Sequence, residues 1–201
     1  MKALGLVAAA GRSLRMGSTK ALLLVDGEPF AARLARVFLD AGLAPVVVTL
    51  PTEEREAERV RAVLPNGVVA RENAHDALGF FGSVLTVIEE TEDLDDETIL
   101  VVTPVDAPFA TAELVRALVS AVDDAHDAAV PVVEGARGHP IAVRRRTLSS
   151  HAAIGRTHGL AGVFAQAGVR LREVAWSDAR VCTSVNTPDE YARLWASSGS
   201  T

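Results

Sequence analysis

Four runs of mostly apolar residues alternate along the chain with segments in which apolar residues recur every three or four positions. The runs cover residues 3–10, 45–50, 99–103 and 128–133. Their nearly continuous hydrophobicity is typical of parallel strands that are buried on both faces. Shorter runs at 68–70 and 172–174 are weaker candidates for strands. We therefore expect a mostly parallel sheet in the interior of the protein.

Five segments have the helical period, and they cover residues 29–41, 53–64, 82–91, 111–125 and 187–197. Gly42 provides a stop for the first helix, and Thr111 and Thr187 are suitable N-caps. Strands that alternate with helices predict an α/β domain with right-handed crossovers. No repeat or low-complexity linker divides the chain, so we expect one domain over residues 1–196 and a disordered tail over 197–201.

Composition and charge narrow the class of protein. A chain of 201 residues, 49% of them hydrophobic, suits one globular domain with a sizeable core. Its net charge of −6 argues against general nucleic-acid binding, which requires a basic face. The single cysteine, Cys182, excludes an internal disulfide and suits a reducing compartment.

The N-terminus begins like a signal peptide, but its apolar stretch stops at Gly11, and a buried first strand explains it better. No segment has the roughly 20 apolar residues that a membrane span requires. We therefore expect a cytoplasmic protein with no membrane partner. The sequence gives no indication of the oligomeric state.

A glycine-containing loop with two basic residues follows the first predicted strand. Glycine at this place lets backbone N–H groups approach phosphate oxygens closely, and Arg15 and Lys20 add two cations to the same loop. The loop has neither the Walker A spacing nor the dinucleotide-binding G-x-G-x-x-G. From spacing alone, a phosphate site and an ordinary loop with solvated basic residues explain it equally well.

The loop becomes more informative as part of a longer motif. The stretch from Leu6 to Gly17, followed by Lys20 and by Asp26-Gly27-Glu28-Pro29, resembles the signature of the MobA-like nucleotidyltransferases. The resemblance implies a single-domain, Rossmann-like, three-layer α/β/α sandwich of the nucleotide-diphospho-sugar transferase type. It also implies that a nucleotidyl group is transferred from a nucleoside triphosphate.

The resemblance also implies roles for residues of the first loop. The backbone at Ala9, Ala10 and Gly11 would hold the base and ribose. Arg15 and Lys20 would contact the triphosphate, with Lys20 nearest the transferred phosphate, and both are predicted to be catalytic. Members that use cytidine nucleotides tend to carry alanine where Ala10 stands, so the resemblance favours CTP.

Two further motifs suggest a magnesium site. Asp106 follows the predicted strand 99–103, a place where open α/β sheets bind ligands, and it matches the catalytic metal aspartate of the family. Asn186 matches a second metal-proximal position. Ser184 departs from the acidic residue of the family pattern, which puts any role of that position in doubt. The alternatives are that Asp106 only forms a turn before proline and that the segment at Asn186 only caps the last helix.

Two middle segments resemble parts of the family that bind the base and the acceptor. Asn73, Gly82 and Ser83 would line the base pocket, although Ser83 is equally suited to cap the helix predicted to begin at residue 82. The Gly138-His139-Pro140 turn resembles the molybdopterin cytidylyltransferase branch and would present Gly138 and His139 to the acceptor. A histidine before proline is more often structural. The basic run at residues 144–146 is either a solvated face or a contact for an anionic acceptor.

These features predict an enzyme that joins a nucleoside monophosphate, with CMP favoured, to a phosphorylated acceptor such as the molybdopterin cofactor and releases pyrophosphate. Mg²⁺ is the expected cofactor, and the nucleoside triphosphate and the acceptor are the expected partners. The first alternative is a transferase that acts on a sugar or polyol phosphate. The second is a non-catalytic nucleotide- or cofactor-binding protein on the same fold.

Overall fold

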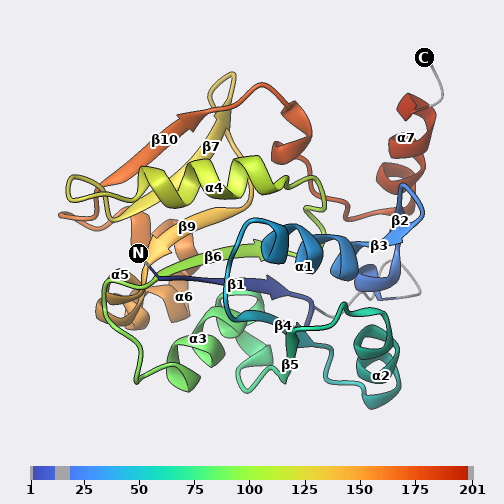
Figure 1. Cartoon of the computed structure of the whole chain (residues 1–201), viewed down its shortest axis with the longest axis horizontal. Coiled ribbons are helices and arrows are strands. Elements are labelled where there is room, and N and C mark those ends of the chain that lie inside the picture. The colour runs from blue at the N-terminus through green and yellow to red at the C-terminus, as the bar shows by residue number, and fades with distance from the viewer. Residues whose placement is uncertain (1, 12–18, 199–201) are drawn as a thin grey trace.

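The protein is built around a sheet of eight strands in which parallel pairing dominates (Figure 1). A computed structural model describes residues 2–11 and 19–198, with side chains up to residue 193. The strand order is β10-β7-β9-β6-β1-β4-β5, with β8 beside β7. The strands are β1 (Ala3–Ala8), β4 (Val46–Leu50), β5 (Val68–Glu72), β6 (Ile99–Pro104), β7 (Ala128–Val133), β8 (Ala136–Arg137), β9 (Ile141–Arg144) and β10 (Leu171–Ala175).

Helices cover both faces of the sheet, as a three-layer α/β/α sandwich requires (Figure 1). Helices α1 and α4 pack on one face, and α3, α5 and α6 pack on the other. The helices are α1 (Phe30–Asp40), α2 (Glu54–Val63), α3 (Gly79–Glu90), α4 (Ala112–Ala121), α5 (Arg145–Ser150), α6 (Ala152–Phe164) and α7 (Pro188–Ser198). The predicted fold class is confirmed.

Side chains point alternately to the two faces of the sheet along the central strands, and they form a separate hydrophobic core on each face. In β6, Ile99 and Val101 pack with α1 and α4, whereas Leu100 and Val102 pack with α3 and α6. All four side chains are fully buried. Because neighbouring residues of a strand point to opposite faces, a strand between two helical layers must be apolar at every position. This explains why the strands appear in the sequence as continuous apolar runs.

The sheet contains one reversal that the sequence interpretation missed. Strand β9 is antiparallel to both β6 and β7, so β6 and β7 are not parallel to all of their neighbours. The four residues of β9 end in an arginine and follow a proline turn, a pattern too short to predict a buried strand. Strand β7, which covers the run 128–133 that was expected to be parallel, therefore pairs in parallel with β10 but antiparallel with β9.

Helix α6 was also missed, and its composition explains why. It contains three glycines, and Gly159 adopts a non-helical conformation with φ 62° and ψ −164° inside the helix. Gly155 is required because a Cβ atom there would meet the Phe81 ring at 1.9 Å. Helix–helix packing therefore selects glycines that weaken the helical signal of the sequence.

Several predicted helix ends are also corrected. The helix predicted over 111–125 ends at Ala121, because the Asp123 carboxylate accepts a hydrogen bond from the amide of Ala125 and forms a turn instead. Thr111 caps this helix as predicted, with its Oγ1 3.2 Å from the amide of Leu114. Helix α7 spans Pro188–Ser198, close to the predicted 187–197, and the expected domain boundary at residue 196 stays a prediction.

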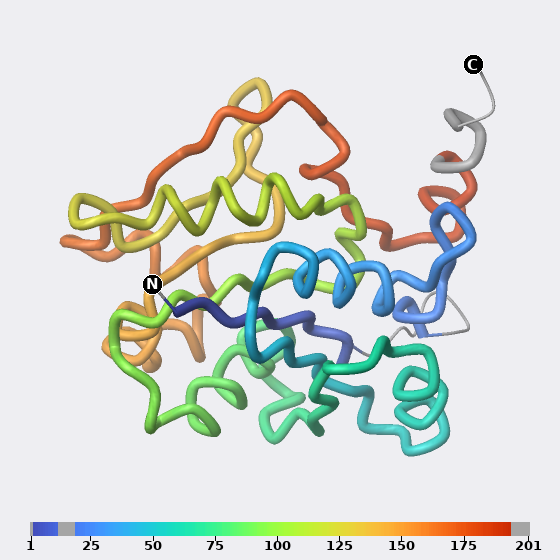
Figure 2. The backbone as a smooth tube through the Cα atoms, viewed as in Figure 1, coloured from blue at the N-terminus to red at the C-terminus, as the bar shows by residue number. Residues whose placement is uncertain are grey.

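The last helix lies beside a small hairpin near the start of the chain (Figure 2). The 3₁₀-helix η1 (Lys20–Leu22) leads into the hairpin strands β2 (Leu24–Val25) and β3 (Glu28–Pro29). The hydroxyl of Tyr191 in α7 donates to the carbonyl of Leu24 at 2.9 Å and accepts from its amide at 3.1 Å. These bonds bring the segment before α7 next to Lys20. Within residues 2–11 and 19–198, no helix is long and apolar enough to cross a membrane.

Candidate active site

A cavity of about 620 Å³ opens at the carboxyl edge of the central strands. It lies where β1 and β6 end and where α3 begins, at the edge where open α/β sheets bind their ligands. The predicted site residues in its wall are Ala9, Ala10, Gly11, Lys20, Asn73, Ser83 and Asp106. Residues from three separate motifs therefore meet in one cavity.

The backbone after β1 forms one wall of this cavity. The amide of Ala9 donates to the carbonyl of Thr49 at 3.1 Å, and the carbonyl of Ala8 accepts from the amide of Val105 at 3.0 Å. These bonds hold the start of the loop between β4 and β6. A Cβ atom on Gly11 would meet no atom of the described chain within 4 Å, so this glycine leaves room for a ligand to approach the backbone. Arg15 lies outside the described residues.

Lys20 joins the two residues that are predicted to bind the metal. Its Nζ atom lies 2.8 Å from Oδ2 of Asp106 and 2.8 Å from Oδ1 of Asn186. The Lys20 and Asp106 side chains are 17% and 20% exposed, so this ion pair is partly shielded from water and is open to the cavity. The two oxygens converge on one cation, as ligands of a metal ion would.

Two features of the backbone bring Asp106 and Asn186 together. The amide of Val185 donates to the carbonyl of Asp106 at 2.8 Å, and the side chain of Val185 is fully buried. The carboxylate of Glu190 accepts from the amides of Asn186 and Thr187 at 2.6 and 2.9 Å, while Oγ1 of Thr187 caps the amide of Glu190. This reciprocal cap confirms the N-cap predicted at Thr187. The hydrogen bonds from these amides lower the pKa of Glu190.

The donor set at this place fits a magnesium ion that shares its coordination with phosphate. Asp106 offers a carboxylate oxygen and Asn186 an amide oxygen, and both suit a hard cation. Within the described part of the chain, no group of three or more histidine, cysteine or acidic side chains forms a complete metal site. A cation here would therefore take its other ligands from the nucleotide and from water, as Mg²⁺ commonly does.

A buried polar network supports the opposite wall. Oγ1 of Thr49 donates to Oγ of Ser83 at 2.8 Å, and Nδ2 of Asn73 donates to the same oxygen at 3.3 Å. Oδ1 of Asn73 accepts from Oγ1 of Thr86 at 3.0 Å and from the amide of His75 at 3.1 Å. Because buried polar groups need partners, this network fixes both Asn73 and Ser83 at the cavity. The alternative that Ser83 caps a helix is wrong, because α3 already begins at Gly79.

Gly82 lies beneath this wall and does not line the cavity. A Cβ atom at this position would come within 2.0 Å of the carbonyl oxygen of His75. The glycine therefore lets the segment from Asn73 to Leu78 pack directly on α3. Its observed contact is structural support for the wall, and its role toward the base stays a prediction.

The Gly138-His139 turn precedes β9, the strand beside β6, and is not among the described residues that line the cavity. The amide of Gly138 donates to the carbonyl of Pro131 at 2.9 Å, and a Cβ atom there would meet the carbonyl oxygen of Val181 at 2.5 Å. The amide of His139 donates to that same carbonyl at 2.9 Å. Burial lowers the pKa of His139 to about 4, against the opposing effect of the Asp106 carboxylate. The imidazole is therefore neutral at neutral pH.

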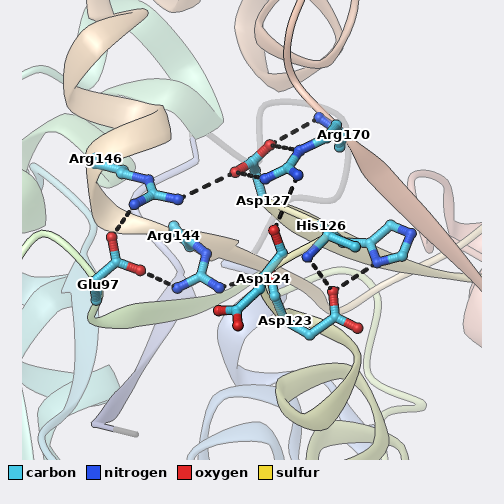
Figure 3. A network of polar contacts seen from close by, with 9 residues as sticks. Glu97, Asp123, Asp124, His126, Asp127, Arg144, Arg146 and Arg170 are labelled. Atoms are coloured by element: carbon cyan, nitrogen blue, oxygen red, sulfur yellow. Dashed lines mark hydrogen bonds and ion pairs between the residues drawn. The ribbon is translucent and has the colours of Figure 1, made fainter.

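The basic run at residues 144–146 belongs to a separate network of ion pairs, in which Arg144 and Arg146 both contact Glu97 (Figure 3). Arg144 pairs with Ile99 at the start of β6, whereas Asp106 follows the end of that strand. Arg144 and Arg145 are 2% and 7% exposed, so the expected solvated face is wrong for them. Their partners, and those of Arg146, are the carboxylates of Asp96, Glu97 and Asp127 and the carbonyl of Asp123.

An acidic and an aromatic residue are among the residues of the cavity wall that were not predicted from the sequence. Asp76 and Phe80 both line the cavity and both lie inside the stretch that was singled out for Asn73 and Ser83. Asp76 accepts a hydrogen bond from Oγ1 of Thr52 at 3.2 Å. The signal was available, because an acidic and an aromatic residue between two predicted pocket residues are candidates for the same pocket.

Known proteins resemble this chain in sequence and in fold. A probable molybdenum cofactor guanylyltransferase of Bacillus cytotoxicus is 27% identical over 65% of this chain and 62% of the relative. A molybdenum cofactor guanylyltransferase of Xanthomonas euvesicatoria is 34% identical over 58% of this chain and 53% of the relative. The chain thus matches less than two thirds of the length of these curated relatives. Their names do not reflect the cytidylyltransferase branch that the sequence suggested.

A solved structure matches the fold over nearly the full length. The Rv0371c protein of Mycobacterium tuberculosis, in complex with manganese, has a TM-score of 0.74 at 24% identity and covers 98% of this chain and 100% of its own. The model of the family described as the MobA-like NTP transferase domain matches residues 5–173. Because this match covers well over half of the chain, the chain belongs to the family of MobA-like NTP transferase domains.

Proposed function

We propose that this protein is a nucleotidyltransferase that moves a nucleoside monophosphate from a nucleoside triphosphate to a phosphorylated acceptor and releases pyrophosphate. The observation that carries the proposal is the position of Lys20 between the oxygens of Asp106 and Asn186, at 2.8 Å from each. Lys20 and Asp106 line a cavity large enough for a nucleotide, and the chain belongs to a family of NTP transferase domains.

Each group of the site has a physical role in this reaction. The backbone at Ala9, Ala10 and Gly11 admits the nucleotide, and Lys20 neutralises its phosphates, as does Arg15 from the undescribed part of the loop. Asp106 and Asn186 would hold Mg²⁺, which, when bound, neutralises charge on phosphate oxygens and orients them for in-line attack. The phosphate of the acceptor is ionised at neutral pH, so the site requires no strong general base.

The base of the nucleotide is proposed to be guanine. The curated relatives are named guanylyltransferases, and Asp76 in the cavity wall offers a carboxylate. Guanine presents two adjacent N–H donors, which a carboxylate can accept together. CTP is the second candidate, and it is favoured by Ala10 in the first loop and by the Gly138-His139-Pro140 turn. Asp76→Asn, which exchanges an acceptor for a donor, should weaken GTP binding much more than CTP binding.

The acceptor is proposed to be molybdopterin or a related phosphorylated cofactor, because the relatives are named as molybdenum cofactor enzymes. Sugar and polyol phosphates are the alternative acceptors. A third possibility is a protein that binds nucleotide or cofactor without catalysis. Mg²⁺ is the proposed cofactor, and manganese is present in a protein of the same fold.

The experiment incubates the protein and Mg²⁺ with each of four α-³²P-labelled nucleoside triphosphates and with molybdopterin or a sugar phosphate. Transfer of label to the acceptor, with equal release of pyrophosphate, is the expected result for GTP and molybdopterin. Transfer of label only from CTP would mean that CTP, and not GTP, is the nucleotide donor. Tight nucleotide binding without transfer to any acceptor would support a binding protein.

A further inference from the structure

Tyr191 attaches the last helix to the body of the protein. Helix α7 lies beside the hairpin strand β2 and stands apart from the main sheet (Figure 1). Within residues 188–193, the part of α7 whose side chains are described, Tyr191 is the hydrophobic residue that packs against the core. Its ring meets the fully buried ring of Phe30 edge to face, with 6.2 Å between the centroids. Tyr191 therefore anchors the start of α7.

The hydroxyl of Tyr191 bonds to both backbone groups of one residue. Leu24 pairs with Pro29 across the hairpin of β2 and β3. The hairpin bond beside this pair runs from the amide of Phe30 to the carbonyl of Leu23 at 2.8 Å, so the N–H and C=O of Leu24 point away from β3. The hydroxyl donates to this carbonyl at 2.9 Å and accepts from this amide at 3.1 Å. One side chain thus couples α7 to the hairpin that follows the first loop.

Asn186 lies between this anchor and a second one. On its N-terminal side, the amide of Val185 donates to the carbonyl of Asp106 at 2.8 Å. On its C-terminal side, the amide of Tyr191 donates to the carbonyl of Thr187 at 3.0 Å, so the first turn of α7 joins the tyrosine to the segment of Asn186. Asn186 itself is exposed, and an exposed side chain has no core packing to hold it. Its place at the site therefore depends on the two anchors.

We propose that Tyr191 is a positioning residue for the complex of metal and nucleotide: its hydroxyl holds α7 on the hairpin and so keeps the amide oxygen of Asn186 beside Asp106. This inference rests on the proposed function, since it concerns the metal ligands of that same site. Lys20, which contacts both oxygens, lies in η1, and η1 leads into the same hairpin. The tyrosine thus fixes the segment of Asn186 relative to the segment of Lys20. Without the hydroxyl, the amide oxygen would become ordered only when the metal binds, and the cost of this ordering would reduce metal affinity.

The test compares how much Mg²⁺ strengthens nucleotide binding in wild type and in Tyr191→Phe, which keeps the ring and removes the hydroxyl. The probes are the α,β-methylene analogues of GTP and CTP, which cannot transfer their nucleotidyl group, and each is titrated calorimetrically in Mg²⁺ and in EDTA. The matched control is Thr91→Val, because Oγ1 of Thr91 also donates to a backbone carbonyl, that of Val87 at 2.6 Å, at the end of α3 away from the cavity. Thermal unfolding establishes that each variant is folded.

We expect Tyr191→Phe to reduce the Mg²⁺-dependent gain in nucleotide affinity by about three- to tenfold, the range for net loss of one hydrogen bond. Its affinity in EDTA should equal that of wild type, and Thr91→Val should match wild type in both conditions. The same gain in Tyr191→Phe as in wild type would overturn the proposal, and so would the absence of any gain in wild type. An equal loss of affinity in Mg²⁺ and in EDTA would overturn it too, because the tyrosine would then support only the nucleotide pocket.

A double substitution shows whether the tyrosine acts through Asn186. Asn186→Ala removes the amide oxygen and should itself reduce the Mg²⁺-dependent gain. Tyr191→Phe should cause no further loss when it is added to Asn186→Ala, because the effects of two residues that act through one interaction do not add. A further loss of about three- to tenfold in the double variant would contradict the proposed link between the two residues.

These readouts separate the two proposals. If the nucleotidyltransferase proposal fails, no label is transferred to any acceptor, yet the Mg²⁺-dependent gain in nucleotide affinity can still depend on Tyr191. If only the positioning proposal fails, transfer persists, and Tyr191→Phe has the same Mg²⁺ requirement for transfer as wild type.

Discussion

The ammonium of Lys20 lies 2.8 Å from the carboxylate of Asp106, a residue 86 positions away in the sequence, and 2.8 Å from the amide oxygen of Asn186. Both oxygens are of the kind that bind divalent cations. The ammonium therefore fills the place between the two predicted metal ligands. A lysine that pairs with these oxygens competes with a divalent cation for them.

Removal of the Lys20 charge should favour a metal ion in the nucleotide-free protein. Lys20→Met leaves the oxygens of Asp106 and Asn186 without a competing cation, so Mn²⁺ should bind at least about tenfold more tightly. Electron paramagnetic resonance of free Mn²⁺ measures this affinity. Lys2→Met, at an exposed position, is the control and should leave it unchanged. Equal Mn²⁺ affinity in Lys20→Met and wild type would mean that Lys20 does not compete at this site.

The amide of Asn186 should set the Mg²⁺ requirement. Asn186→Asp replaces a neutral oxygen donor with a charged one, so the half-saturating Mg²⁺ concentration for transfer should fall several-fold, and Asn186→Ala should raise it. The backbone cap formed by Glu190 is retained in both variants, because it involves the amide of residue 186. Activity titrated against Mg²⁺ gives the result. A requirement that is the same in all three proteins would remove Asn186 from the metal site.

Two glycines of the site should respond to alanine in opposite ways. Gly82→Ala should destabilise the fold by about 1–3 kcal/mol, because its Cβ atom would meet the His75 carbonyl oxygen at 2.0 Å. Gly11→Ala should keep the stability, since no atom of residues 2–11 and 19–198 lies within 4 Å of its Cβ position, and should weaken nucleotide binding by filling the approach to the backbone. Urea unfolding and nucleotide titration measure both effects. Equal stability of the two variants would contradict the close contact at Gly82.

His139 should make the stability of the protein depend on pH. Burial lowers its pKa from 6.5 to about 4, so between these values the unfolded chain binds a proton that the folded protein does not. The buried, neutral imidazole makes its full contribution to the free energy of unfolding above about pH 6.5, and this contribution decreases as the pH falls toward 4. His139→Gln, which cannot titrate, should flatten the free energy of unfolding across this window. Identical pH profiles for the variant and wild type would show that His139 is not buried as described.

The regular parts of the fold could be predicted from the sequence because they follow from burial. A strand such as β6 begins with four apolar residues in a row, because both of its faces meet helices, and this pattern is visible without a structure. Strand β9 and helix α6 were missed because their residues are chosen by contacts with distant segments. Gly155, for example, is explained only by the ring of Phe81.

The site was predictable to the extent that its residues lie in short motifs. Asn73, Lys20 and Asp106 meet in the cavity as the motifs indicated. The pairing of Phe80 with His139 joins residues on two elements far apart in the sequence, and neither pattern alone indicates the other. For the same reason the basic run was misread: Arg144 is buried because it pairs with Glu97, on a segment whose position only the fold determines.

Single-turnover transfer by Asp106→Asn is the measurement that tests the account most directly. The substitution keeps the size of the side chain and removes the charge that holds Lys20 and would bind Mg²⁺. The control is Asp40→Asn, whose carboxylate is exposed in α1. With labelled GTP and molybdopterin, we predict that Asp106→Asn remains folded and binds nucleotide but transfers label at least about 100-fold more slowly, a typical loss for one electrostatic group. Transfer by Asp106→Asn at the rate of wild type and Asp40→Asn would contradict the proposed site.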